Sequence, residues 1–90
     1  MKLTKFQEED IMRKIKLLEE HIDRYRMETI ASVTNPKQWN GAENATTYAC
    51  RLNGYIGELN GIFSVLTILG YGINYDKETD KVISIISEEE

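Results

Sequence analysis

The side chains that could carry out chemistry are few, because the chain has one histidine, His21, and one cysteine, Cys50. Catalysis needs a nucleophile or an acid–base pair held together in a pocket. His21 falls beside the apolar seam of an N-terminal helical segment, where we expect it to bond to a neighbouring side chain. Cys50 has no second histidine or cysteine to activate it, so a packed thiol is expected. The sequence therefore predicts a non-enzymatic protein.

Acidic residues do not form a recognisable metal site either. A Glu-x-x-His pair one helical turn from His21 would need an acid at position 18, which is Leu18. Asp76, Glu78 and Asp80 alternate like the beginning of a calcium loop, but the glycine and the late glutamate of such a loop are missing. The glycines lie inside an apolar segment, unlike those of phosphate-binding loops. We expect no metal ion and no cofactor.

A row of small residues is the feature that points to binding. Gly54, Gly57 and Gly61 recur at spacings of three and four, so they share one face of a helix. Cys50 and Ser64 extend this row, which we call the glycine row. Each glycine inside a helix costs roughly 1 kcal/mol relative to alanine. Because the three glycines weaken the helix, we expect another backbone or a ligand to lie close against them.

Three occupants of the glycine row are compatible with the sequence. The N-terminal helix of the same chain could pack there, leaving the wide apolar stripe of the second helix to the β-hairpin. The row could instead meet its own copy in a symmetric dimer or a larger ring. The third occupant is a small planar ligand, with Tyr48, Tyr55 or Trp39 stacking on it and Arg51 meeting an anionic group.

The elements that must position these residues begin with a helix over residues 5–33. Thr4 and Gln7 have the spacing of a capping box at its start. Apolar residues then recur at four and three, as in a short heptad seam of an antiparallel helix pair. The seam comprises Ile11, Ile15, Leu18, Ile22 and Tyr25. The charged residues outside it are expected on a solvated face: Lys14, Lys16, Glu19, Glu20, Asp23, Arg24 and Arg26.

Asn35 and Pro36 end this helix, since proline disfavours a helical conformation in the residue before it. The connector over residues 34–40 carries Trp39, which either covers the open end of the helix pair or is an exposed anchor for a partner. A second helix follows over residues 41–69 and ends at Gly70. Its wide apolar stripe comprises Ala45, Ala49, Leu52, Ile56, Leu59, Phe63 and Leu66.

The pattern then changes to the alternation of a β-hairpin over residues 71–86, with a polar turn at residues 76–80 and an acidic tail at 87–90. The apolar residues Val82, Ile83, Ile85 and Ile86 fall on both faces of the second strand. Burial on both sides, or pairing with a strand of another chain, would explain them. We predict an α+β fold, a single domain of residues 1–90 in which an antiparallel two-helix hairpin precedes a two-stranded β-hairpin.

Charge and composition argue against nucleic-acid binding, a membrane span and export. The net charge is −4 and no basic stripe exists, so direct binding to duplex nucleic acid is disfavoured. No segment is long and apolar enough for a membrane span, and no export signal follows the first lysines. A single cysteine suits the reducing cytoplasm.

The first hypothesis for function is a small homo-oligomeric protein that binds another protein, such as a phage or mobile-element inhibitor of a host defence protein. Its interface would include the glycine row and Trp39, and Met12, Leu17 and Met27 lie off the seam where a partner could meet them. The second hypothesis is a protein that sequesters a nucleotide-like signal at a subunit interface. Arg51, Lys37, Tyr48 and Tyr55 would bind that ligand.

Overall fold

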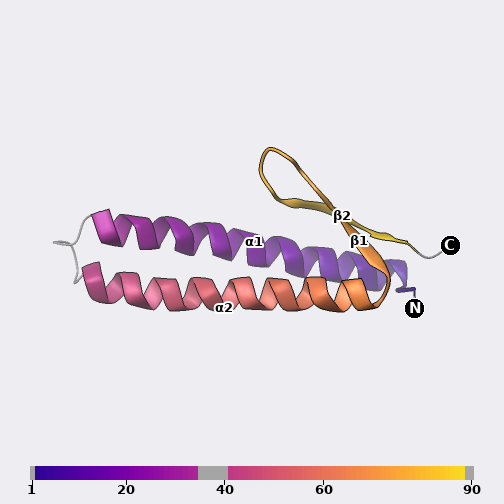
Figure 1. Cartoon of the computed structure of the whole chain (residues 1–90), viewed down its shortest axis with the longest axis horizontal. Helices are drawn as coiled ribbons and strands as arrows, with labels where there is room; N and C mark the ends of the chain where they lie inside the picture. The colour runs from indigo at the N-terminus through magenta and orange to yellow at the C-terminus, as the bar shows by residue number, and fades with distance from the viewer. Residues whose placement is uncertain (1, 35–40, 89–90) are drawn as a thin grey trace.

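Two long helices and a β-hairpin make up the fold. The structure is a computed structural model that describes residues 2–34 and 41–88, of which 32, 33 and 41–45 as backbone alone. The elements are α1 (Lys5–Thr34), α2 (Gly41–Ile68), β1 (Tyr71–Tyr75) and β2 (Val82–Ser87). The helices run antiparallel, and the hairpin folds back from the end of α2 across α1 (Figure 1). The predicted α+β arrangement is confirmed.

Local signals in the sequence set the ends of the helices. At the start of α1 the Thr4 amide donates to Gln7 Oε1 over 2.9 Å, and the Gln7 amide donates to Thr4 Oγ1 over 3.1 Å. This reciprocal pair is the predicted capping box. At the end of α2, Gly70 has a φ of 84°, a left-handed conformation that glycine adopts without steric cost. The chain can therefore leave the helix and enter β1 within two residues.

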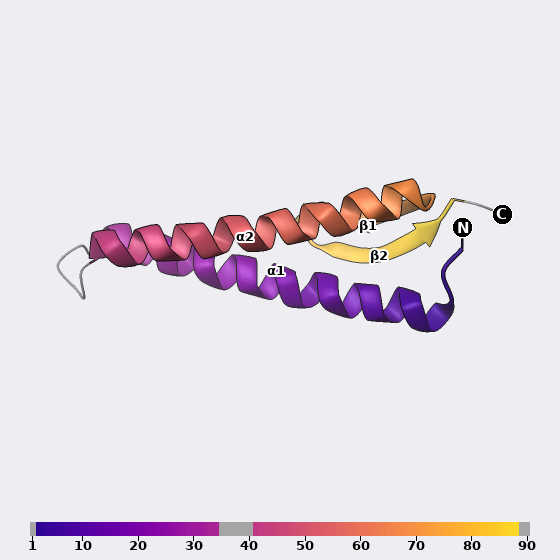
Figure 2. The same ribbon diagram turned by 90° about the horizontal axis from the view of Figure 1, so that it is seen from below.

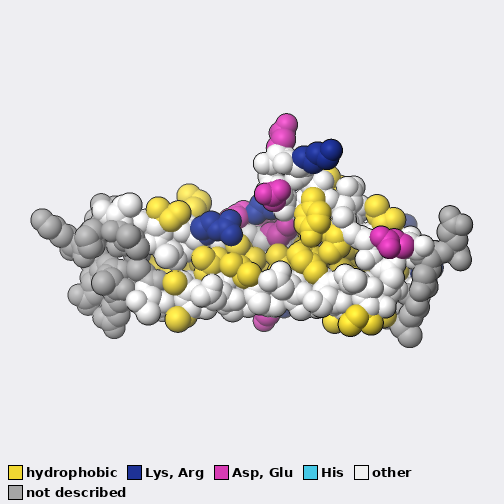
Figure 3. All heavy atoms as spheres, viewed as in Figure 1, with side chains coloured by type: hydrophobic (Ala, Val, Ile, Leu, Met, Phe, Trp, Pro, Cys, Tyr) yellow, Lys and Arg dark blue, Asp and Glu magenta, His cyan; other side chains and the backbone are white. Residues whose placement is uncertain are grey.

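The predicted seam of α1 faces α2. Ile15, Leu18, Ile22 and Tyr25 are buried, and Ile11 is partly buried. The helix pair is close along much of its length, as a second view shows (Figure 2). The apolar stripe of α2 meets both α1 and the hairpin, because Leu66 is buried in one cluster with Ile15 of α1, Tyr71 of β1 and Val82 of β2. Figure 3 shows hydrophobic side chains gathered where the helices meet and below the hairpin.

The hairpin is antiparallel, with Tyr71 opposite Ser87 and Ile73 opposite Ile85. A register shift beside Tyr75, which pairs with Val82, leaves Ile83 as the extra residue of a bulge. As a result Val82 is buried, whereas the Ile83 side chain is 54% exposed.

The apolar residues of β2 are therefore not buried on both faces. Ile85 packs against the core, but the side chains of Ile83 and Ile86 are 54% and 53% exposed. The prediction of two-sided burial is wrong within this chain. The physical reason is that the sheet has two strands and the helix pair covers one of its faces. The other explanation, pairing with a strand of another chain, stays a prediction.

Charged side chains of α1 hold the hairpin in place. Glu19 Oε2 accepts a hydrogen bond from the Val82 amide over 2.9 Å, and Lys16 Nζ donates to the Val82 carbonyl over 3.3 Å. Asp23 forms an ion pair with Lys81. We call Lys16, Glu19 and Asp23 the hairpin clamp. The sequence pattern predicts all three on a solvated face, and for Glu19 this is wrong, because that residue is only 9% exposed.

The turn of the hairpin is built from its acidic residues. Asp76 Oδ1 accepts a hydrogen bond from the Glu78 amide over 2.9 Å, and the Asp76 carbonyl accepts one from the Asp80 amide over 2.8 Å. Asp80 has a φ of 59°, which aspartate tolerates better than most side chains. These residues shape a turn, as the polar pattern of the sequence predicted.

Among the described residues, neither helix combines the length and the apolar character that crossing a lipid bilayer requires.

Candidate functional site

The glycine row lies on the exposed side of α2. For Gly54, Gly57 and Gly61, no atom outside the adjoining helix backbone lies within 4 Å of the position that a Cβ would take. The option in which α1 packs against the row is therefore wrong. The larger side chains of the α2 stripe determine this outcome, because burying them against α1 and the hairpin turns the opposite side of the helix outward.

The two ends of the glycine row are also at the surface. Cys50 is an exposed free thiol, so the expectation that it is packed is wrong, because the row it belongs to faces outward. Ser64 is exposed, and its Oγ donates to the Asn60 carbonyl over 3.0 Å, as serines inside helices often do. Trp39, the remaining residue of the predicted interface, falls outside the described residues.

Large apolar side chains continue the glycine row toward the end of α2. Val65 follows Gly61 by four residues and Ile68 follows three later, and their side chains are 55% and 83% exposed. A groove of about 450 Å³ opens beside Gly61. Its lining comprises Ile11, Glu58, Gly61, Ile62, Val65 and Leu66. One face of α2 therefore presents a strip without side chains followed by two exposed apolar side chains.

Aromatic rings form a second cluster, on the seam between the helices. The His21 ring stacks on Tyr55 with centroids 4.9 Å apart, and Tyr55 stacks on Tyr25 at 5.6 Å. Tyr48 lies 6.0 Å from Tyr25 in a tilted arrangement. We call these four residues the aromatic column. Two of the rings predicted to stack on a ligand, Tyr48 and Tyr55, thus pack against rings of α1. His21 bonds to a neighbour as expected, with its Nδ1 lying 3.4 Å from Arg24 Nη2.

Two arginines meet at the centre of this column. Arg51 Nη1 donates to the Tyr25 hydroxyl over 3.5 Å, and the guanidinium carbon of Arg24 lies 4.9 Å from the centroid of the Tyr25 ring. Hydrogen bonds from Arg51 and Arg24 hold the pKa of Tyr25 below its usual value of 10.0, because both stabilise the phenolate. The structure therefore brings together three of the residues predicted for ligand binding, Arg51, Tyr48 and Tyr55. Lys37, the fourth, is outside the described residues.

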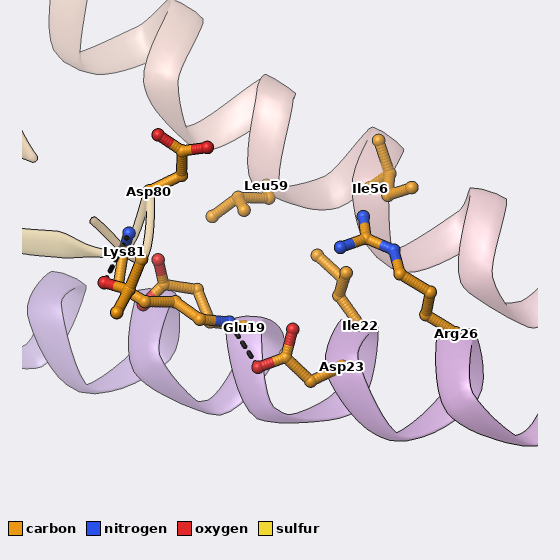
Figure 4. Close-up of a pocket in the computed structure, with 9 residues that line it drawn as sticks. Glu19, Ile22, Asp23, Arg26, Ile56, Leu59, Asp80 and Lys81 are labelled. Atoms are coloured by element: carbon orange, nitrogen blue, oxygen red, sulfur yellow. Dashed lines mark hydrogen bonds and ion pairs between the residues drawn. The ribbon is translucent and has the colours of Figure 1, made fainter. Parts of the chain in front are cut away.

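A cleft of about 360 Å³ lies between the two helices and the turn of the hairpin (Figure 4). Its apolar floor is formed by Ile22, Ile56 and Leu59, and Asp80 and Arg26 stand at opposite ends. The carboxylates of Glu19 and Asp23 in this cleft bind the Val82 amide and Lys81. Most of the charged groups in this cleft therefore hold the hairpin against the helices, so the cleft is a packing contact between these elements.

In the described part of the chain, no three side chains among histidine, cysteine, aspartate and glutamate are grouped so that they could hold a metal ion. Comparison with protein-family models, curated proteins and solved structures finds no match for this chain. The functional argument therefore rests on the surfaces described above.

Sequence reasoning missed two groups of residues at these surfaces. It assigned Arg24 to a solvated face and Tyr25 to the seam, and the structure confirms both, but it did not place either residue in the group that Arg24, Tyr25 and Arg51 form. The sequence around Arg24 and Tyr25 does not indicate this contact, because their partner Arg51 is on the other helix. Val65 and Ile68 continue the spacing of the glycine row, so extending the row beyond Ser64 would have found them.

Proposed function

We propose that this chain is a small non-enzymatic interaction protein that forms a symmetric antiparallel dimer through α2. The observation that carries the proposal is the symmetry of one surface about Gly61. Gly57 and Val65 lie four residues on either side of it, and Gly54 and Ile68 lie seven residues on either side. In an antiparallel pair with Gly61 on the two-fold axis, each Val65 faces Gly57 of the partner and each Ile68 faces Gly54.

This arrangement uses the features that the monomer leaves open. The side chains of Val65 and Ile68 are exposed, and the space above Gly54 and Gly57 is empty. Burying an exposed valine or isoleucine side chain contributes about 1.5–3 kcal/mol. A two-fold contact buries each of them twice. The summed free energy from these burials is comparable with the roughly 4–15 kcal/mol that association costs. We therefore expect a reversible dimer whose population falls on dilution.

The same proposal includes a second protein as the target. Leu17 and Met27 are exposed on α1, as expected for residues that a partner meets, whereas Met12 packs partly against the core. A dimer presents each α1 surface twice, which favours binding by avidity to a paired or repeated target. We propose that the protein acts in the cytoplasm by occupying the surface of such a target, as a phage or mobile-element inhibitor of a host protein would.

Sedimentation analysis over a range of protein concentrations tests the dimer. We expect Gly54→Leu to weaken association at least about tenfold, because the new side chain occupies the space that Ile68 of the partner needs. Ile68→Ala should also weaken it, by removing the apolar side chain that is buried. The double variant should associate more tightly than Gly54→Leu alone, because the shorter side chain at position 68 of the partner leaves room for the leucine at position 54.

Glu20→Leu is the matched control, since it adds a leucine at an exposed position of α1 away from the glycine row. Because the space around Gly54 is empty, circular dichroism should show that every variant keeps its helices. A chain that stays monomeric at all concentrations, or equal association of Gly54→Leu and the original sequence, would disprove the proposed interface.

A further inference from the structure

A pair of arginines from different helices converges on one tyrosine. The guanidinium carbons of Arg24 on α1 and Arg51 on α2 lie 4.9 Å and 5.8 Å from the centroid of the Tyr25 ring. Arg51 Nη1 also lies 3.5 Å from the Tyr25 hydroxyl. Both arginines stabilise the phenolate form by hydrogen bonding, and this lowers the pKa of Tyr25. Both guanidinium groups therefore lie beside the same tyrosine, one of them at its hydroxyl and the other over its ring.

Among the side chains that the structure describes, the ion pairs join Arg13 to Asp10 and Lys81 to Asp23, and neither Arg24 nor Arg51 takes part in one. Among the described residues, the hydrogen-bonding neighbours of the two arginines are the Tyr25 hydroxyl and the His21 ring. Two like charges held close together favour binding of an anion, most strongly a doubly charged one.

The aromatic column limits which part of a ligand can enter. The Tyr55 ring already stacks with both His21 and Tyr25, so it is not available to sandwich a nucleobase. What remains open to solvent are the guanidinium groups, since Arg24 and Arg51 are both exposed. A ligand would thus be held by its charged group.

We propose that Arg24, Arg51 and the Tyr25 hydroxyl bind the phosphoryl group of a small molecule, either inorganic phosphate or a phosphate monoester. Arginine is suited to this role because its planar fork offers parallel N–H donors to two phosphoryl oxygens. The Tyr25 hydroxyl donates a hydrogen bond to the third oxygen. The site is complete within one chain, so it does not depend on the dimer proposed above.

Titration of the protein, with isotope-labelled tyrosine and arginine, followed by NMR tests this site. The probes are inorganic phosphate, adenosine monophosphate and adenosine, each at constant ionic strength set with sodium chloride. We expect phosphate and the monophosphate to shift the Tyr25, Arg24 and Arg51 signals to saturation. They should also raise the pKa of Tyr25, because a bound anion counters the two arginines. Tighter binding of the monophosphate would assign the site to a monoester, and equal binding would assign it to the free anion.

The variants Arg24→Gln and Arg51→Gln should each weaken binding at least about tenfold, since each removes a charge-assisted pair of hydrogen bonds. Arg13→Gln is the matched control, because Arg13 is an exposed arginine of α1 that pairs with Asp10. No saturable shift with either phosphate probe would overturn the proposal. An equal loss in Arg13→Gln, or adenosine binding as tightly as its monophosphate, would overturn it as well.

Discussion

At the scale of single residues, the most informative side chain is Glu19. A glutamate on the side of a helix is normally solvated, yet this one is 9% exposed and accepts the Val82 amide hydrogen bond. Val82 is one of the residues at the centre of the core, so its backbone polar groups are shielded from water. Glu19 and Lys16 together satisfy its amide and its carbonyl. The clamp thereby supplies hydrogen-bond partners to backbone groups of β2, because a two-stranded sheet has no third strand to pair with its outer edge.

Replacing Glu19 should therefore destabilise the fold more than replacing its neighbour. Glu19→Ala leaves the buried Val82 amide without an acceptor, which costs about 1–3 kcal/mol. Glu19→Gln keeps an acceptor oxygen and should lose less. The control is Glu20→Ala, an exposed position where the change should stay within about 0.5 kcal/mol. Urea unfolding curves measure all three, and equal stability of Glu19→Ala and Glu20→Ala would show that the clamp does not contribute.

At the scale of elements, local patterns predicted the fold well. The Thr4–Gln7 capping box, the seam from Ile15 to Tyr25 and the left-handed Gly70 are present as the sequence indicated. Each of these features depends on residues within a few positions of one another. Apolar residues at spacings of three and four indicate a helix, and strict alternation indicates a strand, so both patterns reflect the local backbone conformation directly.

The contacts between elements were less accessible from the sequence. Periodicity shows that α2 has two distinct faces. The direction in which each face points depends on how the apolar stripe of α2 packs against α1 and against the hairpin. The clamp joins Glu19 to Val82, and a hydrogen bond joins Arg51 to Tyr25, across separations that no local pattern encodes. Arg51, Tyr48 and Tyr55 lie close together because all three are on one side of α2, whereas the α1 residues beside them were not predicted.

Two glycines, one inside α2 and one at its boundary, should respond in opposite directions to alanine. Gly57→Ala places a methyl group in open space, so the folded monomer should gain up to about 1 kcal/mol from the better helix propensity. Gly70→Ala should instead lose about 1–2 kcal/mol, because its φ of 84° is unfavourable for a side chain. Thermal unfolding of dilute protein measures both changes. A loss of monomer stability in Gly57→Ala would mean that the row is not open.

At the scale of the whole molecule, burial is uneven along the helix pair. The chain is elongated, with extents of 56 × 23 × 18 Å. Among the residues whose side chains are described, the buried ones lie at positions 15–25 of α1, at Leu66 of α2 and in the hairpin. None lies in 26–34 or in 46–65. The hairpin thus adds a third layer to the part of the helix pair that is distant from the connector (Figures 1 and 2).

This uneven core predicts a gradient of local opening along the helix pair. Amides over residues 26–31 and 46–51 should exchange with solvent faster than those over 11–22 and 62–68, because few buried apolar contacts oppose their opening. Hydrogen exchange of monomeric protein at low concentration measures this gradient. Val82→Ala provides the internal comparison, since it removes about 2 kcal/mol of buried contact from the hairpin end alone. Protection should then fall at residues 11–22 and 62–68 and change little near the connector; a uniform loss along both helices would instead mean that the pair opens as one cooperative unit.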